Sequence, residues 1–347
     1  MLLQSILFFV GITGVYFGAE WLVKGSSKLS RDLGIKPIVI GLTVVAFGTS
    51  SPEFAVSLTA AIKGSNDIAI GNIIGSNIAN IGLILGIAAI VLPLEVEKVI
   101  MKRELPLMIG ISAGLYCMAI DRKIGFIDGL LLFTGIILYI GYQVYNTLNY
   151  KKETRNSTGN TEDVPASLSV NSSCLQANSS SSDNKAGMPE STNEEGQTRR
   201  HLLSNIVYIV IGLACLLVGS HILVKSAIFI AGSFGISEMV IGMTVVAFGT
   251  SVPEMATSVV SALRKEADIC VGNVIGSNIF NILMVLGSVA LIRPLNVVRE
   301  TLFFEFPVMI LFSIALIPMI RGDLRVNRLE GIVLVSGYFA FIFFLFR

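Results

Sequence analysis

The stretch that decides the fold is GLTVVAFGTSSPEFAVSLTAA (residues 41–61), because it occurs a second time as GMTVVAFGTSVPEMATSVVSA (residues 242–262). A second matched block follows each copy at the same distance: GNIIGSNIANIGLILG (residues 71–86) and GNVIGSNIFNILMVLG (residues 272–287). Adding 201 to a residue number in the first half gives its partner in the second, with no gap across either pair of blocks. The chain is therefore an internal duplication.

Composition places this duplication in a membrane. Of the 347 residues, 53% are hydrophobic and only 14% are charged, and the mean hydropathy is +0.76. A water-facing fold cannot bury that much apolar surface, so a soluble domain is excluded. Runs long enough to cross about 30 Å of hydrocarbon predict ten spans, five in each half, near residues 2–23, 36–62, 68–94, 104–120, 124–147, 202–230, 237–262, 268–292, 300–320 and 328–346.

The odd number of spans per repeat predicts that the two halves are inverted relative to each other. If a repeat crosses five times, the next copy enters the membrane from the opposite side. When the N-terminus is placed outside, 18 of the 25 Lys and Arg residues fall in inner loops, which favours both termini outside. We therefore predict an all-α integral membrane protein with repeats at 1–150 and 201–347, joined by a cytoplasmic loop at 151–200.

The joining segment, 151–200, is the only stretch with a soluble composition. Ser, Thr and Asn make up 21 of its 50 residues, and apolar residues are too sparse to offset the entropy of ordering it. It has no calcium-binding loop signature. We predict a flexible linker.

Each copy of the first motif places a glutamate directly after a proline within apolar sequence. Pro52 cannot donate a backbone hydrogen bond, so the carbonyl of Gly48 loses its usual partner and the helix should be interrupted before Glu53. The second copy repeats this at Pro253 and Glu254. Irregular backbone at membrane depth is tolerated where it lines a wet cavity, and the freed carbonyls there are expected to become cation ligands.

The second block adds amide and hydroxyl oxygens at helical spacing. One helical face carries Asn72, Ser76 and Asn80, and the other copy carries Asn273, Ser277 and Asn281. The blocks contain no histidine and no cysteine. Ligands that are all oxygen suit Ca²⁺ and Na⁺, whereas zinc or copper recruits His or Cys.

Structural interpretations compete with these functional ones. A membrane glutamate can serve helix contact alone, but burying a carboxylate costs about 2.5–3.5 kcal/mol, and here it occurs twice in the same context. Asn80 and Asn281 can hydrogen-bond between helices, and Ser50 and Ser251 can do the same. Four other acids are expected near membrane interfaces or in loops, with no role in the site: Glu20, Glu104, Asp128 and Glu305.

The blocks GTSSPE with GSNIAN, and GTSVPE with GSNIFN, resemble the two alpha-repeats of the cation/calcium exchanger superfamily, in particular Na⁺/Ca²⁺ exchangers of prokaryotic type. The resemblance covers nearly all ten spans. It implies that Glu53 and Glu254 are the central carboxylate ligands, and that spans one and six slide across the other eight. It also implies three Na⁺ exchanged per Ca²⁺. The remaining implied ligands are Thr49, Ser50, Ser76, Asn80, Thr250, Ser251 and Ser277, with backbone carbonyls from Ala46 and Ala247.

One position departs from part of that superfamily. Some relatives, including K⁺-dependent exchangers, carry Asp where this chain has Asn281. A third carboxylate is then missing from the metal-binding set, and K⁺ co-transport is not expected.

The sequence thus predicts a sodium/calcium antiporter in the cell membrane, electrogenic and K⁺-independent. Ca²⁺ and Na⁺ are its transported ions, the lipid bilayer surrounds it, and neither a cofactor nor nucleic acid is expected. An H⁺/Ca²⁺ antiporter of the same fold stays open, because the glutamates can also exchange protons. A cation channel is disfavoured by the inverted pair of broken helices. An intramembrane hydrolase is disfavoured because no His or Lys lies in the blocks to activate a serine. The oligomeric state is left open.

Overall fold

Helices account for almost all of the first half. The computed structural model of the chain describes residues 2–159, 191–234 and 247–345. The first-half elements are α1 (Leu2–Leu33), α2 (Pro37–Ile40), η1 (Gly41–Val45), α3 (Ala46–Thr49), α4 (Ser51–Lys63), α5 (Asn66–Ala79), η2 (Asn80–Leu85), α6 (Gly86–Val91), β1 (Leu94–Glu95), η3 (Ile100–Glu104), α7 (Leu105–Met118), η4 (Ala119–Asp121), β2 (Lys123–Ile124) and α8 (Phe126–Gly159).

Within the described residues the second half follows the same order of elements, without a counterpart of η4, and the positions equivalent to α2 and η1 lie in 235–246, outside the described ranges. Its elements are α9 (Ser191–Ser233), α11 (Ala247–Thr250), α12 (Val252–Leu263), α13 (Ala267–Phe280), η6 (Asn281–Leu286), α14 (Gly287–Ile292), β3 (Leu295–Asn296), η7 (Thr301–Glu305), α15 (Phe306–Arg321), β4 (Arg325–Val326) and α16 (Arg328–Leu345). Even the π-helical turns recur, since η2 and η6 start at equivalent asparagines. Turns of this kind are rare and concentrate at functional sites.

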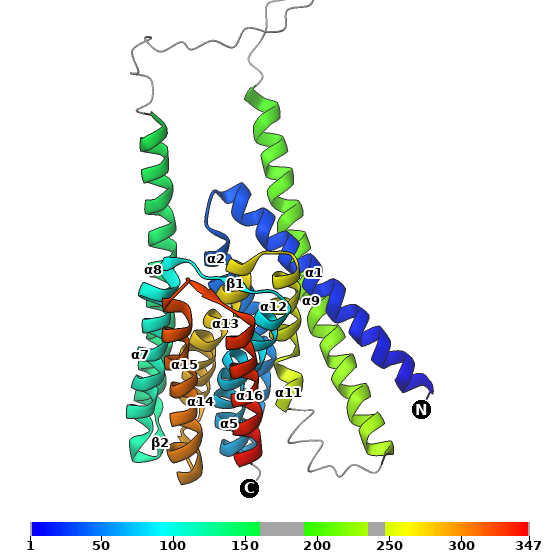
Figure 1. Ribbon diagram of the computed structural model, residues 1–347, viewed down its shortest axis with the longest axis vertical. Coiled ribbons are helices and arrows are strands. Elements are labelled where there is room, and N and C mark those ends of the chain that lie inside the picture. Colours follow the sequence, from blue (N-terminus) through cyan, green and yellow to red (C-terminus); the bar gives the residue numbers. More distant parts are fainter. Residues whose placement is uncertain (1, 160–190, 235–246, 346–347) are drawn as a thin grey trace, which may run out of the picture.

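The two halves run in opposite directions. Figure 1 shows α1 rising from the N-terminus at the lower end of the molecule, whereas its counterpart α9 descends from the upper end. The C-terminus lies at the same end as the N-terminus, and the chain ends that flank 160–190 lie at the other. This is the inversion that an odd number of spans predicts. Which end faces the cytoplasm stays a prediction.

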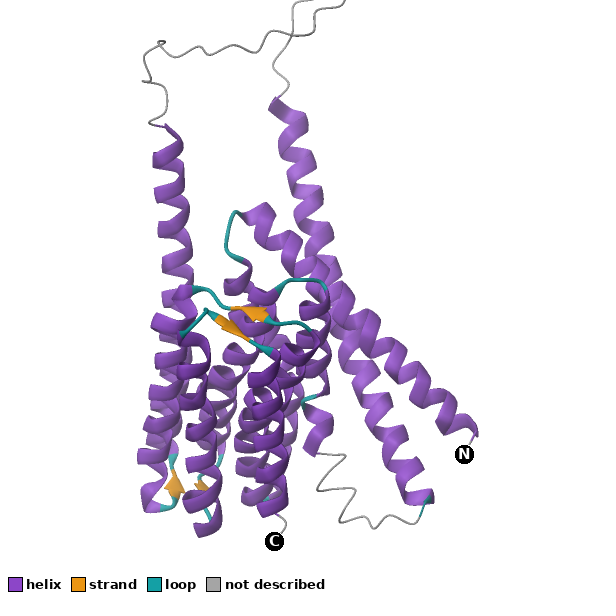
Figure 2. Ribbon diagram, viewed as in Figure 1, coloured by secondary structure: helices purple, strands orange, loops and turns teal. Residues whose placement is uncertain are grey.

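Two short antiparallel ribbons tie the halves together at opposite ends of the bundle (Figure 2). β1 pairs with β4, with Leu94 opposite Val326, and β2 pairs with β3, with Ile124 opposite Leu295. Each ribbon takes one strand from each repeat. The four apolar residues in these pairs are fully buried, so the ribbons anchor the loops to the core.

The prediction of an all-α membrane protein is confirmed. Within the described residues, eight helices are long and apolar enough to cross a membrane, or nine if the bent pair that α2–α3 and α4 form is one span. The tenth expected span, 237–262, falls partly on residues outside the described ranges. The segment expected to be a linker is partly helical, because α8 continues to Gly159 and α9 begins at Ser191.

The helices that carry the second motif form the centre of the core. In their most apolar stretches, 83% of the residues of 66–91 and 78% of those of 267–292 are buried, against 17% for α16. Both helices are apolar around most of their circumference, as a helix surrounded by other helices must be. Close packing needs small residues here: a Cβ on Gly276 would lie 2.7 Å from the Leu42 carbonyl oxygen and 2.7 Å from Ala46 Cβ.

Candidate ion-binding site

Both Pro-Glu motifs lie at helix breaks, as the sequence predicts. In the first half α3 ends at Thr49 and α4 begins at Ser51, with a bend of 42° between the helical pieces. In the second half α11 ends and α12 begins on either side of one residue. Each break puts its glutamate, Glu53 or Glu254, in the first turn of the following helix, where free N–H groups and the helix dipole favour negative charge.

The two glutamates are buried, and each is held by the other half of the protein. Ser251 Oγ donates to Glu53 Oε1 at 3.3 Å, and Ser50 Oγ donates to Glu254 Oε1 at 3.3 Å. The exposed fractions are 0% for Glu53 and 1% for Glu254. In both side chains the second oxygen, Oε2, has no hydrogen-bond partner within the described residues. No cationic side chain pairs with either carboxylate in the described part of the chain.

Hydroxyl groups surround the carboxylates and also cross between the halves. Thr49 Oγ1 lies 3.5 Å from Ser277 Oγ, and Ser251 Oγ lies 3.3 Å from Ser76 Oγ. All four residues are buried, and so is Thr250. The structure therefore brings every predicted hydroxyl into contact with the opposite repeat.

Asn72 and Asn273 anchor these hydroxyl groups. Thr250 Oγ1 donates to Asn72 Oδ1 at 3.3 Å, and Thr49 Oγ1 donates to Asn273 Oδ1 at 3.1 Å. The Asn72 amide nitrogen donates to Ser57 Oγ at 2.9 Å and to the backbone oxygen of Glu53 at 3.2 Å, and Asn273 makes the equivalent bonds in its own half. Both amide nitrogens are engaged and each oxygen accepts one hydroxyl, so these two residues hold the hydroxyl groups of the site in place.

Asn80 and Asn281 combine the two interpretations that the sequence left open. The Asn80 amide nitrogen donates to Asn278 Oδ1 at 3.0 Å, and the Asn281 amide nitrogen donates to Asn77 Oδ1 at 3.1 Å. Their carbonyl oxygens are buried and have no partner among the residues that the structure defines. Each amide thus makes an interhelical bond with one end and leaves an oxygen available with the other.

Sequence reasoning missed Asn77 and Asn278, which hold these two amides. They stand one position off the helical face that carries Ser76, Asn80 and their counterparts, so a spacing argument passes over them. The signal was the exact recurrence of Gly-Ser-Asn in both halves.

The two carbonyls that the prolines free each have a hydroxyl partner. The Gly48 oxygen accepts a hydrogen bond from Ser51 Oγ at 2.5 Å, and the Gly249 oxygen accepts one from Ser220 Oγ of α9 at 3.4 Å. The sequence predicted that these oxygens would be available to a cation, and in the structure each of them accepts one serine hydroxyl. A lone carbonyl in a low-dielectric interior is costly, and a nearby hydroxyl satisfies it.

Ala46 contributes a carbonyl that is only partly engaged. It accepts the backbone N–H of Ser50 at 3.0 Å. Thr49 Oγ1 lies 3.4 Å away but has a closer acceptor in Asn273, so one lone pair of the Ala46 oxygen remains open. The counterpart Ala247 begins α11, and the preceding residues of its motif, 242–246, lie outside the described ranges.

The donor set is chemically uniform. Carboxylate, amide, hydroxyl and carbonyl oxygens line the site, and no group of three or more His, Cys, Asp and Glu that could hold a metal occurs in the described residues. Cys270, just before the second block, is buried and free. Such oxygens suit hard cations such as Na⁺ and Ca²⁺.

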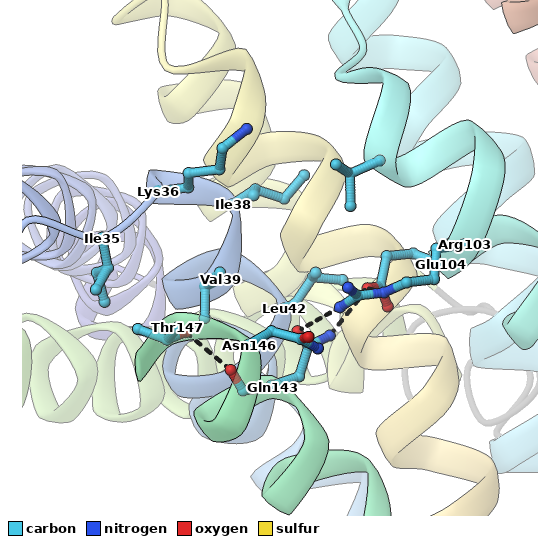
Figure 3. A pocket seen from close by; sticks show the side chains of 11 residues that line it. Ile35, Lys36, Ile38, Val39, Leu42, Arg103, Glu104, Gln143, Asn146 and Thr147 are labelled. Atoms are coloured by element: carbon cyan, nitrogen blue, oxygen red, sulfur yellow. Dashed lines mark hydrogen bonds and ion pairs between the residues drawn. The ribbon is translucent and has the colours of Figure 1, made fainter. Parts of the chain in front are cut away.

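Glu104, expected near a membrane interface or in a loop, is the last residue of η3 and is buried, with an exposed fraction of 1%. Figure 3 shows it beside Arg103 and Gln143 at the edge of a cavity of about 150 Å³. Arg103 pairs with it at 2.9 Å, and Gln143 and Tyr139 donate to it at 3.1 Å and 3.2 Å.

The remaining acids have local partners. Glu20 pairs with Arg264. Asp128 accepts the backbone N–H of Gly125 at 2.8 Å, and Glu305 accepts Thr301 Oγ1 at 3.1 Å. Among the described residues, none of the three has a hydrogen bond or ion pair to the site residues named above.

Comparisons with known proteins agree with the architecture and the motifs. A family model described as sodium/calcium exchanger protein matches residues 3–150 and 204–347. The chain is 36% identical over 349 residues to the putative antiporter CaxA of Alkalimonas amylolytica, covering 100% of this chain and 99% of that one. It is 35% identical over 343 residues to the sodium/calcium exchanger MaX1 of Methanosarcina acetivorans, covering 98% of each.

A solved structure is similar over the same extent. The sodium-calcium exchanger NCX_Mj superposes with a TM-score of 0.78 at 30% identity, covering 98% of each chain. This chain therefore belongs to the sodium/calcium exchanger protein family. It is a multi-pass membrane protein of a family of secondary transporters, not of enzymes.

Proposed function

We propose that this protein is a sodium/calcium antiporter in which Glu53 and Glu254 bind Ca²⁺ and Na⁺ in alternation. The observation that carries the proposal is the pair of buried carboxylates that have no cationic partner among the described residues, each with an unpaired oxygen. Removing a charge from water without a counter-charge is costly, so such a pair requires a bound cation or proton to compensate it.

The proposed ligand set combines these carboxylates with the surrounding oxygens. Ca²⁺ takes about 6–8 oxygen ligands, more than two carboxylates can supply. The open carbonyl oxygens of Asn80, Asn281 and Ala46 and the nearby hydroxyls would supply the remainder. The hydroxyl groups are those of Thr49, Ser50, Ser76, Thr250, Ser251 and Ser277, and Ala247 would mirror Ala46.

Charge balance favours exchange over one-way movement. Two carboxylates carry about two negative charges, which one Ca²⁺ or at least two Na⁺ neutralise. A transition with neither ion would carry an uncompensated anionic cavity through the protein interior. The transition between the two access states is therefore expected to require a bound load. With three Na⁺ per Ca²⁺, the stoichiometry that the sequence resemblance implies, each cycle would move net charge.

The resemblance implies that spans one and six, which are α1 and α9, slide across the other helices during transport. The packing of α1 on α9 supports this movement. A Cβ on Gly18 would lie 2.4 Å from the backbone nitrogen of Leu216, and one on Gly212 would lie 2.5 Å from that of Leu22. This glycine contact lets the helices pack as one unit, and many of their other apolar side chains are exposed. A unit of this kind can slide over the remaining helices with little change inside either part.

Proton-coupled Ca²⁺ exchange is the second candidate. The site contains carboxylates with free oxygens, which can accept protons in place of Na⁺. The name of the relative CaxA specifies an antiporter without naming its ions. K⁺ coupling is not expected, because the site holds two carboxylates and Asn281 supplies no third charge.

The test is ⁴⁵Ca²⁺ uptake into proteoliposomes loaded with Na⁺, with Na⁺ outside replaced by choline. Uptake that depends on the outward Na⁺ gradient supports the proposal. Uptake that follows an imposed pH gradient and ignores Na⁺ overturns it in favour of proton coupling. Uptake that continues with no counter-ion gradient at a clamped potential would indicate a channel.

A separate experiment tests the predicted cytoplasmic location of the segment between α8 and α9. The protein is placed in vesicles of known orientation, and cleavage of this segment by a protease added outside is measured.

A further inference from the structure

Asn77 and Asn278 connect the two repeats by hydrogen bonds to two of the proposed ion ligands. Each is buried, with exposed fractions of 1% and 2%, and each accepts the amide nitrogen of an asparagine in the opposite half. Asn278 holds Asn80 at 3.0 Å, and Asn77 holds Asn281 at 3.1 Å. The two bonds are related by the offset of 201 residues, so the arrangement is a crossed pair.

The orientation of each amide in the pair follows from its fixed neighbours. The amide nitrogen of Asn77 faces the backbone carbonyl of Asn278 at 3.5 Å and the sulfur of Met309 at 3.7 Å, both of which can only accept. Asn77 must therefore turn its Oδ1 toward Asn281, and the Asn281 amide nitrogen must donate to it. The same holds on the other side, where the nitrogen of Asn278 faces the sulfur of Met108 at 3.6 Å.

These hydrogen bonds determine which atom of the Asn80 and Asn281 side-chain amides faces the proposed ion site. With their nitrogens held, Asn80 and Asn281 can present only Oδ1 on the other side, and both of these oxygens are buried without a hydrogen-bond partner in the described residues. A flipped amide would present two N–H donors instead, which repel a cation. Orientation of the amide thus decides whether the residue is a ligand or an obstacle.

We propose that Asn77 and Asn278 are positioning residues, each fixing the amide of the opposite repeat so that its carbonyl oxygen faces the transported cation. The inference rests on the proposed ion site and deepens it. Each of these two ligands is oriented by a residue of the opposite repeat. Both carbonyl oxygens therefore face the ion only when the two repeats pack against each other as they do in this structure. Residues that orient metal ligands typically change affinity by about 10–100-fold when they are removed.

The test is calorimetric titration of Ca²⁺ into the purified full-length protein in detergent without Na⁺, with thermal unfolding measured in parallel. Asn278→Leu removes the acceptor at similar volume, and Asn77→Leu does the same for the other half. Each is expected to weaken Ca²⁺ binding by about 10–100-fold. Asn278→Ser, which is smaller and too short to reach Asn80, gives the same result if the leucine variant fails to fold.

Two buried serines provide matched controls. Ser112 donates to the Met108 carbonyl at 2.9 Å, and its counterpart Ser313 donates to the Met309 carbonyl at 3.0 Å. Ser112→Ala and Ser313→Ala perturb the same packing layer without touching the asparagines, and Ca²⁺ affinity should stay unchanged. If these variants weaken binding as much as Asn278→Leu does, packing rather than orientation is responsible and the inference is wrong.

A double variant separates orientation from general damage. Aspartate at position 80 has two equivalent oxygens, so it needs no orienting partner. In an Asn80→Asp background, Asn278→Leu should change the Ca²⁺ Kd by less than about twofold, the scatter of additive effects. An equal loss in both backgrounds overturns the inference. Absence of Ca²⁺ binding by the unmodified protein would instead overturn the proposed function.

Discussion

The glutamates of the candidate site and Glu104 are equally buried, but their surroundings differ. Glu53 and Glu254 each receive one serine hydroxyl and keep a second oxygen without a partner among the described residues. Glu104 has Arg103 beside it and bonds to both oxygens from Gln143 and Tyr139. Burial therefore does not distinguish the two proposed ion-binding acids from Glu104. Missing compensation does, because an isolated buried charge needs a counter-ion.

Symmetry separates the two cases as well. The contacts around Glu53 recur around Glu254 with the two halves exchanged. The counterpart of Glu104 is Glu305, which has a threonine donor instead of an arginine. A pair that serves packing can differ between the repeats, whereas a site formed by both repeats has to be built twice.

The largest expected effect tests the uncompensated pair. Glu53→Gln and Glu254→Gln should each abolish ⁴⁵Ca²⁺ uptake while the protein stays folded and inserted, because each removes a charge that Ca²⁺ requires and few packing atoms. Gel filtration and thermal unfolding of the purified variants provide the control. Normal exchange by either variant would show that the comparison with Glu104 has no functional meaning.

The compensated pair should respond in stability rather than in transport. Arg103→Gln leaves Glu104 buried without its cation and should lower the free energy of unfolding by about 2 kcal/mol, less than for a fully buried pair because Arg103 is partly exposed. Arg103→Gln with Glu104→Gln should recover most of the loss. Thermal unfolding measures both. Arg325→Gln breaks an exposed pair with Glu95 and should cost almost nothing. Lost uptake by folded Arg103→Gln protein would contradict this prediction.

A smaller effect is expected when a third carboxylate joins the site. Asn281→Asp should alter the relative affinities for Na⁺ and Ca²⁺, whereas uptake by the unmodified protein should be indifferent to K⁺ at constant potential. Replacing K⁺ by choline while a separate ionophore clamps the voltage tests the second point. A strict K⁺ requirement in the unmodified protein would contradict the assignment of two charges to the site.

The smallest effect is expected outside both regions. Excision of residues 160–190 should leave exchange nearly unchanged, because this stretch is rich in Ser and Asn, has few apolar residues and carries no calcium loop. Uptake by the deletion variant, compared at equal amounts of inserted protein, provides the measurement. Loss of transport by folded protein would make the segment part of the mechanism.

Much of the site was predictable because duplication marks it. The Pro-Glu pairs identified the helix breaks, and spacing on one helical face identified Ser76, Asn80 and their copies. The partner of the Gly249 carbonyl was not predictable, because Ser220 reaches it from α9, whereas the partner of Gly48 is Ser51, only three residues away. The burial of Glu104 was missed for the same reason: its partners Tyr139 and Gln143 lie on another helix, and sequence spacing cannot reveal such contacts.

By itself, the sequence determined that this is an inverted duplication in a membrane, with two acids at broken helices and a set of oxygen-bearing side chains spaced for one site. Composition, periodicity and proline chemistry are local properties, so they can be read without coordinates. Only the tertiary structure decided which acids are compensated and which amide oxygens stay open. Those properties depend on the donors that the opposite repeat brings within about 3 Å, and this is set by how the two halves pack.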